Sequence, residues 1–169
     1  ATGTLEVVGE GDVDILIVAG GGVGGNGSGN GGGGGGAGQF LATTSAITIA
    51  GPMVLTCTIG AGGTKNAPTG GTKGNDTSVT HTSGAGTWVT KTATGGGIGG
   101  AGYTSQGGTG GSGGGGGADG SGGTTGANYY AGWDERVYEG GSGGSALYEW
   151  TAGGGGGGAQ TGQNPFSQP

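Results

Sequence analysis

Residues 31–36 read Gly-Gly-Gly-Gly-Gly-Gly, and two further pure glycine runs follow at residues 113–117 and 153–158. Glycine accounts for 57 of the 169 residues, so few side chains are present from which to build an ordinary core. A chain of this composition is either disordered or uses its backbone as packing material. Collagen is excluded, because the chain has only 4 prolines and no sustained Gly-X-Y period.

Strand-like patterns separate the glycine runs and argue against disorder. Segments rich in β-branched residues, or alternating apolar and polar residues, predict strands at Asp14–Ala19, Ala46–Ile49, Leu55–Ile59, Thr87–Thr94 and Ala146–Thr151. The second and third segments flank Gly51-Pro52, which predicts a β-hairpin. Trp88 is expected to anchor the fourth strand, and no segment combines helical periodicity with suitable caps.

The pure glycine runs favour the polyproline-II conformation, which has three residues per turn and no internal hydrogen bonds. Glycine helices of this kind can lie side by side because no Cβ separates them, and their free backbone groups can then pair between helices. Helices inside such a slab must be all glycine, whereas edge helices can carry outward side chains. The expected fold is therefore mainly β with polyglycine-II helices: short antiparallel strands, a stacked slab of glycine helices and essentially no α-helix.

The length of the chain predicts one glycine-rich domain over residues 1–169. We expect residues 1–95 to be the strand-rich part and residues 96–158 the glycine-rich part, which includes an aromatic segment at 129–150. Residues 159–169 are expected to form an extended tail. Because the chain begins at Ala1, it is interpreted as a processed form or an excised piece.

Charge excludes several classes of partner. The net charge is −6 and only 8% of the residues are charged. The four basic residues are too few and too scattered to neutralise a run of nucleic-acid phosphates or to bind an anionic membrane; they are Lys65, Lys73, Lys91 and Arg136. No apolar stretch approaches the length of a membrane span. Cys57 cannot form an internal disulfide, and a small buried hydrophobe is its expected role.

Residues 20–25 formally match the dinucleotide-binding pattern G-x-G-x-x-G. That motif requires a helix next, and an acidic residue about 20 positions further on. The following residues 26–36 are almost all glycine, and no Asp or Glu occurs between Asp14 and Asp76. The match is therefore interpreted as chance, and no cofactor is expected.

Catalytic chemistry has little support in the sequence. His81, the only histidine, is expected in a Thr/Ser-rich loop, where a solvated role is favoured over a catalytic base. Asp12 and Asp14 are expected on one face of a strand, and Asp134 adjoins Glu135. Either acidic pair could imitate a carboxylate dyad or part of a calcium site, but solvated charge is favoured because further oxygen ligands are lacking. We expect no enzyme activity and no metal site.

The aromatic segment is the strongest candidate for recognition. Six of its aromatic residues and one arginine form the predicted binding surface or subunit interface: Tyr129, Tyr130, Trp133, Arg136, Tyr138, Tyr148 and Trp150. Aromatic rings beside hydrogen-bonding groups suit a sugar or a protein partner. The alternative is that the rings form an apolar cap over one end of the glycine slab.

Four stretches together resemble glycine-rich domains of bacteriophage tail fibres, tail-tip adhesins and related microbial surface proteins. They are Gly11-Asp-Val-Asp-Ile-Leu-Ile-Val-Ala-Gly-Gly-Gly22, Gly36-Ala-Gly-Gln-Phe40, Thr58-Ile-Gly-Ala-Gly-Gly63 and Thr92-Ala-Thr-Gly-Gly-Gly97. The resemblance covers roughly residues 11–118. It implies a sandwich of polyglycine-II helices whose connecting loops carry receptor specificity.

Two functions follow from these expectations. The resemblance implies a non-enzymatic adhesin domain, extracellular or on the virion surface, that is attached to a fibre and binds a bacterial glycan or outer-membrane protein. The alternative is a self-assembling subunit of an extracellular filament, whose partners are copies of itself in a homo-oligomer. Ice binding is a third, weaker hypothesis, because the threonines show no regular spacing.

Overall fold

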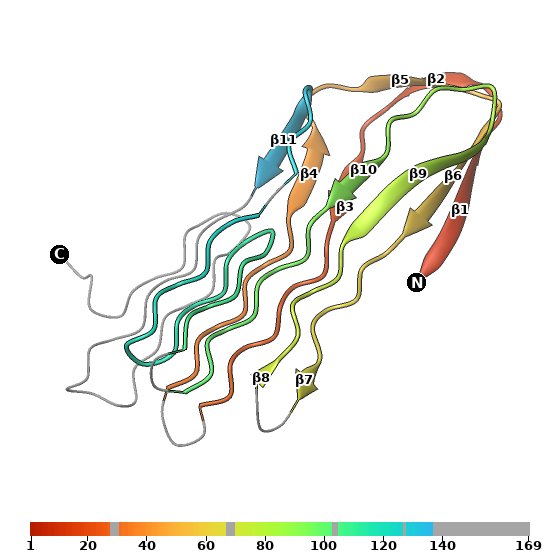
Figure 1. The fold of residues 1–169 in the computed structure, drawn as a ribbon. Coiled ribbons are helices and arrows are strands. Elements are labelled where there is room, and N and C mark those ends of the chain that lie inside the picture. The colour runs from red at the N-terminus through yellow and green to blue at the C-terminus, as the bar shows by residue number, and fades with distance from the viewer. Residues whose placement is uncertain (28–30, 67–69, 103–104, 127, 137–169) are drawn as a thin grey trace.

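The computed structural model describes residues 1–27, 31–66, 70–102, 105–126 and 128–136. Over these residues the chain is mainly β, with short antiparallel strands and no helix. It follows that the described part of the chain has no helix long and apolar enough to cross a membrane. The larger sheets gather at one end of the molecule, and glycine-rich segments run side by side away from them (Figure 1).

The largest sheet has four antiparallel strands in the order β1-β6-β9-β10. Its strands are β1 (Thr2–Val7), β6 (Met53–Thr58), β9 (Thr77–Gly84) and β10 (Lys91–Ala93). Odd-numbered residues of β1 and β6 share one face, since Leu5 is paired with Leu55 and Val7 with Met53. Leu55 and Met53 are both 1% exposed, so this face of the sheet is the apolar one.

The remaining strands form three smaller sheets. The three-stranded sheet has the order β11-β4-β3, from β11 (Trp133–Arg136), β4 (Phe40–Thr43) and β3 (Leu16–Val18). The two-stranded sheets pair β2 (Glu10–Val13) with β5 (Ile47–Ala50), and β7 (Lys65–Asn66) with β8 (Gly70–Gly71). The core cluster joins the three-stranded sheet to β10 and contains Ile17, Ala19, Leu41, Ala93 and Trp133.

The glycine-rich segments are joined by backbone hydrogen bonds that recur at every third residue. Amides three positions apart in one segment donate to the same neighbouring segment. The amides of Ala19, Gly22 and Gly25 donate to segment 31–39, and those of Gly33, Gly36 and Gln39 donate to segment 94–102. The amides of Ser112, Gly115 and Ala118 also donate to segment 31–39. The residues between these donors reach other segments; for example, Gly20 and Val23 donate to segment 72–76. Each segment therefore presents its amides in several directions, unlike a strand, whose amides point only two ways.

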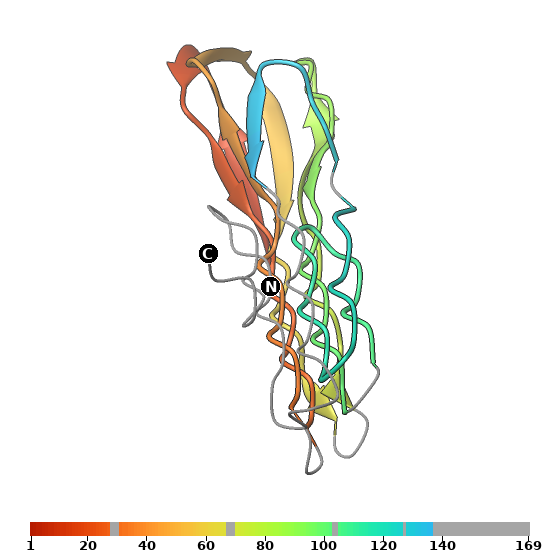
Figure 2. The ribbon, with the colours of Figure 1, turned by 90° about the vertical axis from the view of Figure 1, so that its left-hand side faces the viewer.

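These hydrogen bonds arrange the segments in a slab of three layers, which runs lengthwise below the larger sheets (Figure 2). The first layer contains segments 31–39, 19–27 and 59–64, in that order. The second contains 112–118, 94–102 and 72–76, and the third contains 119–126 and 105–111. Segment 94–102 lies in the middle and shares backbone hydrogen bonds with five other segments.

Glycine is required in the slab because the backbones approach too closely for a side chain. A Cβ placed on Gly22 would collide with the carbonyl oxygen of Gly97, and one on Gly33 with that of Gly115. In contrast, a Cβ on Gly21 would lie 3.6 Å from the Gly36 oxygen, which is an ordinary van der Waals contact. The need for glycine is thus set by the direction in which each residue points.

The predicted hairpin around Gly51-Pro52 is wrong, although both of its strands exist. β5 pairs with β2, while β6 pairs with β1 and β9, so the two strands belong to different sheets. The pairing of β1 with β6 covers six residues of each strand, which is more than a hairpin with the four-residue β5 could supply. The Gly51 amide donates instead to the Gly9 carbonyl at 2.8 Å.

Two other strand predictions are confirmed only in part. Asp14–Ala19 contains β3 alone, and of Thr87–Thr94 only residues 91–93 are a strand. Trp88 precedes β10, where its indole nitrogen donates to the Val79 carbonyl at 3.0 Å. The expected strand Ala146–Thr151 lies outside the described residues.

Candidate binding surfaces

The described aromatic residues of the predicted surface differ in exposure. Tyr129 is 66% exposed, Tyr130 is half-buried, and Trp133 is 8% exposed within the core cluster. Arg136 is the last residue of β11, where it is paired with Phe40. The other three predicted residues, Tyr138, Tyr148 and Trp150, lie outside the described residues. Trp133 therefore packs inside the protein, and among the described rings of the predicted surface Tyr129 is the most exposed to a partner.

A lysine lies over two of these rings. The Lys91 Nζ is 4.5 Å from the centroid of the Tyr130 ring and 5.6 Å from that of Trp133. At these distances the ammonium is attracted to the electron-rich ring faces. The Tyr130 hydroxyl also accepts a hydrogen bond from the Thr92 amide at 3.0 Å. Both contacts fix Tyr130 on β10.

A buried glutamine holds the chain just before these rings. Gln39 is fully buried, and its Oε1 accepts hydrogen bonds from the amides of Thr94, at 3.0 Å, and Asn128, at 3.2 Å. Its Nε2 donates to the Asn128 carbonyl. The Asn128 Nδ2 in turn donates to the Thr92 carbonyl at 3.0 Å. This polar network ties residues 128–130 to β10 and β4, and neither Gln39 nor Asn128 was expected from the sequence.

The histidine and the two acidic pairs lie on different elements: His81 in β9, Asp12 in β2 and Asp134 in β11. His81 is in β9, not in a loop as expected, because its segment pairs with β6, and its Nε2 lies 2.8 Å from the Ser83 carbonyl oxygen. Asp12 is in β2 and accepts from the Thr48 hydroxyl at 2.6 Å, whereas Asp14 lies between β2 and β3. In the described part of the chain, no three His, Cys, Asp or Glu residues form a group that could hold a metal ion.

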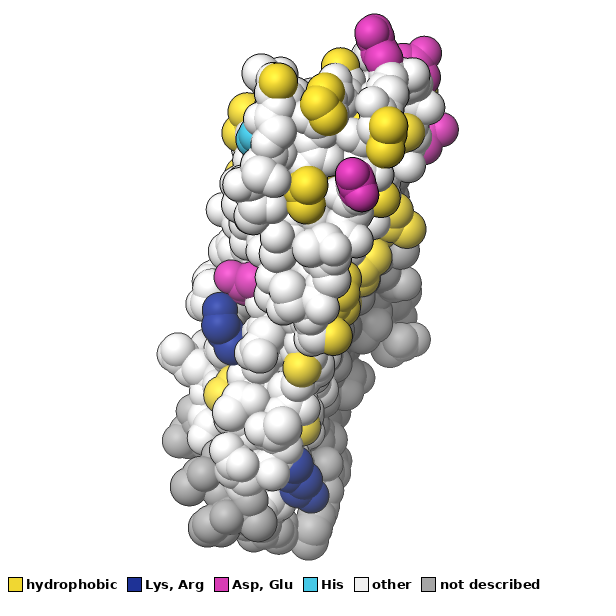
Figure 3. Space-filling view, turned by 90° about the vertical axis from the view of Figure 1, so that its right-hand side faces the viewer, with side chains coloured by type: hydrophobic (Ala, Val, Ile, Leu, Met, Phe, Trp, Pro, Cys, Tyr) yellow, Lys and Arg dark blue, Asp and Glu magenta, His cyan; other side chains and the backbone are white. Residues whose placement is uncertain are grey.

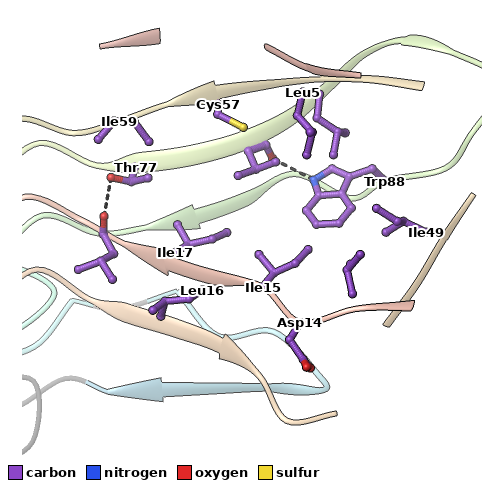
Figure 4. A pocket seen from close by; sticks show the side chains of 14 residues that line it. Leu5, Asp14, Ile15, Leu16, Ile17, Ile49, Cys57, Ile59, Thr77 and Trp88 are labelled. Atoms are coloured by element: carbon purple, nitrogen blue, oxygen red, sulfur yellow. Dashed lines mark hydrogen bonds between the residues drawn. The ribbon is translucent and has the colours of Figure 1, made fainter. Parts of the chain in front are cut away.

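An apolar cleft of about 380 Å³ lies between the four-stranded sheet and β3 (Figure 4). Thr77 closes one side, since its hydroxyl donates to the Val18 carbonyl at 2.8 Å, and Trp88 lies on the other. Cys57 lines the cleft and is half-buried. Four lining residues are at least half exposed: Leu5 (50%), Val18 (51%), Ile59 (53%) and Leu16 (60%). Figure 3 shows a line of hydrophobic side chains along the β1 side of the molecule.

Several described segments end at the end of the slab farthest from the larger sheets (Figure 1). Consecutive antiparallel segments have their ends there at residues 27 and 31, 66 and 70, and 102 and 105, and the chain turns back at 118–120. Exposed polar side chains near these segment ends belong to Lys65, Asn66 and Asp119. We call this region the slab tip.

The comparisons with known proteins agree with the glycine-rich character of the fold. The family model described as "Glycine-rich domain" matches residues 1–169. No curated protein and no solved structure matches the chain. Since the family model spans the whole sequence, the chain belongs to the glycine-rich domain family.

Proposed function

We propose that this chain is a non-enzymatic, extracellular binding domain of the phage tail-fibre or tip-adhesin kind. The observation that carries the proposal is the slab tip, where the ends of several segments meet at one end of a hydrogen-bonded scaffold. Loops held by a rigid scaffold are the usual place for binding residues. The proposed receptor is a bacterial surface glycan or an outer-membrane protein, and the location is the virion surface or another extracellular structure.

We further propose that the slab segments are polyglycine-II helices. The supporting observation is the three-residue spacing of the hydrogen bonds between segments, since polyproline-II geometry has three residues per turn. A crystal structure or NMR couplings would measure the glycine backbone angles. Values near φ −75° and ψ +145° are expected, whereas a cluster near the antiparallel β values of about −140° and +135° would contradict the proposal.

A binding experiment with whole bacteria tests the adhesin function. The labelled 169-residue chain would be titrated against a panel of bacterial cells and isolated surface glycans. Replacing Lys65 and Asn66 together with Ser is expected to weaken binding about tenfold or more, because both side chains are exposed at the slab tip. Val89→Ala is the matched control, since Val89 is 72% exposed and lies away from the tip, before β10.

The aromatic surface is the second place where a receptor could bind. Tyr129→Ala removes its exposed ring and tests this surface independently of the slab tip. If this variant loses binding while the tip variant binds normally, the receptor site is the aromatic segment and not the tip. Absence of binding to every cell and glycan tested would overturn the adhesin proposal.

A filament subunit remains the second candidate function, and the outer edge of β1, with which no described strand pairs, favours it. Electron microscopy of the purified chain separates the two functions. Discrete particles are expected of an adhesin domain. Long polymers formed by the chain alone would instead support the filament and contradict the adhesin.

A further inference from the structure

Among the described strands, β1 is the outermost of the four-stranded sheet and has a partner on one side only. It pairs with β6 over residues 2–7, and no other described strand pairs with it. Five of its six residues are exposed and the sixth, Val7, is half-buried. Strands at sheet edges are commonly protected from further pairing by lysine, proline or a bulge. β1 contains none of these, and its one charged residue is Glu6.

The hydrogen bonds beside β1 show which of its backbone groups point outward. The Ala1 amine donates to the Ile59 carbonyl at 3.1 Å, and the Ile59 amide donates to the Ala1 carbonyl at 2.7 Å. In an antiparallel ladder such doubly bonded pairs alternate with unbonded ones. The backbone N–H and C=O groups of the odd-numbered residues of β1 therefore point toward β6. Those of Thr2, Thr4 and Glu6 point outward, away from β6.

We propose that this edge pairs with β1 of a second copy of the chain, antiparallel, about a two-fold axis at Thr4. This register places Thr4 opposite Thr4 and Glu6 opposite Thr2 of the second copy. All three outward-facing residues are then matched, giving about six backbone hydrogen bonds. A shift that places Leu5 opposite Leu5 gives about four, and a further shift places Glu6 opposite Glu6, where like charges repel.

The side chains of β1 are complementary in the same register. Leu5 is 50% exposed, and it would lie opposite Gly3 of the second copy. A Cβ at Gly3 would have nothing within 4 Å, so the space above it is open. Each Leu5 can thus fill the space over the partner's Gly3, beside the apolar residues Cys57 and Ile59 on the same face. Such reciprocal contacts are the signature of a two-fold interface.

Sedimentation equilibrium over a range of concentrations tests the proposal, with one substitution that blocks the outer edge alone. Thr4→Pro removes an N–H that points away from β6, so the pairing of β1 with β6 is preserved, as is usual for proline in an edge strand. Wild type is expected to dimerise, and Thr4→Pro to weaken dimerisation about tenfold or more. Thr4→Val is the matched control, because it keeps the amide and should dimerise like wild type.

Disulfide cross-linking tests the register. With Cys57 replaced by Ser, Thr4→Cys should give a cross-linked dimer on oxidation, because facing residues of a doubly bonded pair have Cα atoms about 5.5 Å apart, within disulfide range. Preferential cross-linking by Leu5→Cys would overturn the Thr4-centred register.

The dimer proposal and the adhesin proposal fail separately. A wild-type chain that stays monomeric at every concentration, or a Thr4→Pro variant that dimerises unchanged, overturns the dimer whether or not bacteria are bound. Loss of bacterial binding leaves the dimer proposal intact.

Discussion

At the scale of single residues, the direction in which a Cβ would point decides whether a slab position requires glycine. Gly21 and Gly22 are neighbours in one slab segment. A Cβ added to Gly21 would make an ordinary van der Waals contact, whereas a Cβ added to Gly22 would collide with a backbone carbonyl. Backbone atoms cannot move aside as a flexible side chain can. Glycine-to-alanine changes in the slab should therefore have opposite outcomes at adjacent positions.

Gly22→Ala is expected to destabilise the protein by about 1–3 kcal/mol or more, as overpacking of an interior does. Gly21→Ala should be neutral or stabilising by up to about 1 kcal/mol, because it reduces the freedom of the unfolded chain without a clash. Chemical denaturation of the two variants measures the difference. Equal destabilisation would mean that glycine is needed for its backbone conformation and not for close approach.

Gln39 is a buried polar residue that joins the chain just before β4 to Asn128, 89 positions further along. Gln39→Met keeps the length of the side chain but leaves the amides of Thr94 and Asn128 without their acceptor. A buried unsatisfied group costs about 1–3 kcal/mol; because both hydrogen bonds are only part-buried, a total loss of about 2 kcal/mol is expected in thermal unfolding.

The control for Gln39→Met is Thr44→Val, which removes an exposed hydroxyl that donates to the Gly132 carbonyl at 3.1 Å. Its effect should stay within about 0.5 kcal/mol. A Gln39→Met variant as stable as this control would show that water or a rearranged loop satisfies the freed amides.

At the scale of elements, the junction between β3, β9 and the slab depends on one hydroxyl. Thr77 is 3% exposed; its Oγ1 accepts from the Gly60 amide at 3.0 Å and donates to the Val18 carbonyl at 2.8 Å. It thus joins two sheets at the point where they separate above the slab.

Thr77→Val preserves the shape of the side chain and removes both hydrogen bonds. We expect it to cost about 1–3 kcal/mol, while Thr77→Ser, which keeps the hydroxyl, should cost about 1 kcal/mol or less. Hydrogen exchange at the Gly60 amide would be faster in the valine variant. If serine proves as harmful as valine, packing of the methyl group, and not the hydroxyl, secures the junction.

Local pattern predicts some of the strands that carry aliphatic residues, but neither β1 nor β4, and it does not predict the partners. β3 lies within an expected segment, and β5 and β6 overlap theirs, whereas β9, with the sequence Thr-Ser-Val-Thr-His-Thr-Ser-Gly, has the composition of a loop. Its strand conformation comes from pairing with β6 and β10, which no local pattern specifies. The same limit applies to the predicted hairpin, because β5 pairs with β2 and β6 pairs with β1 and β9.

The spacing of non-glycine residues in the sequence reflects the slab in a way that the composition does not. In two segments, non-glycine residues recur three positions apart: Val23 with Asn26, and Ile98 with Ala101. This spacing equals that of the hydrogen-bond donors, so the two side chains of each pair point in one direction. The polar network of Gln39 and Asn128 left no such signal, because it joins residues that are far apart in the chain.

At the scale of the whole molecule, two kinds of packing meet in one chain. The sheets bury aliphatic and aromatic side chains around Leu41, Leu55 and Trp133. The slab instead brings glycine backbones together through hydrogen bonds. Only the packing in the sheets removes much apolar surface from water. On unfolding, exposure of apolar surface raises the heat capacity, whereas exposure of peptide groups lowers it.

The heat capacity change of unfolding should therefore be small for the length of the chain. Ordinary proteins gain about 12–15 cal/mol/K per residue, or about 2.0–2.5 kcal/mol/K for a chain of this size. We expect less than about 1.5 kcal/mol/K, measured by scanning calorimetry at several pH values. A value in the ordinary range would contradict a slab held by backbone hydrogen bonds, because exposure of glycine backbone cannot supply it. A small value would also flatten the stability curve, so that cooling weakens this protein less than one of equal size with a hydrophobic core.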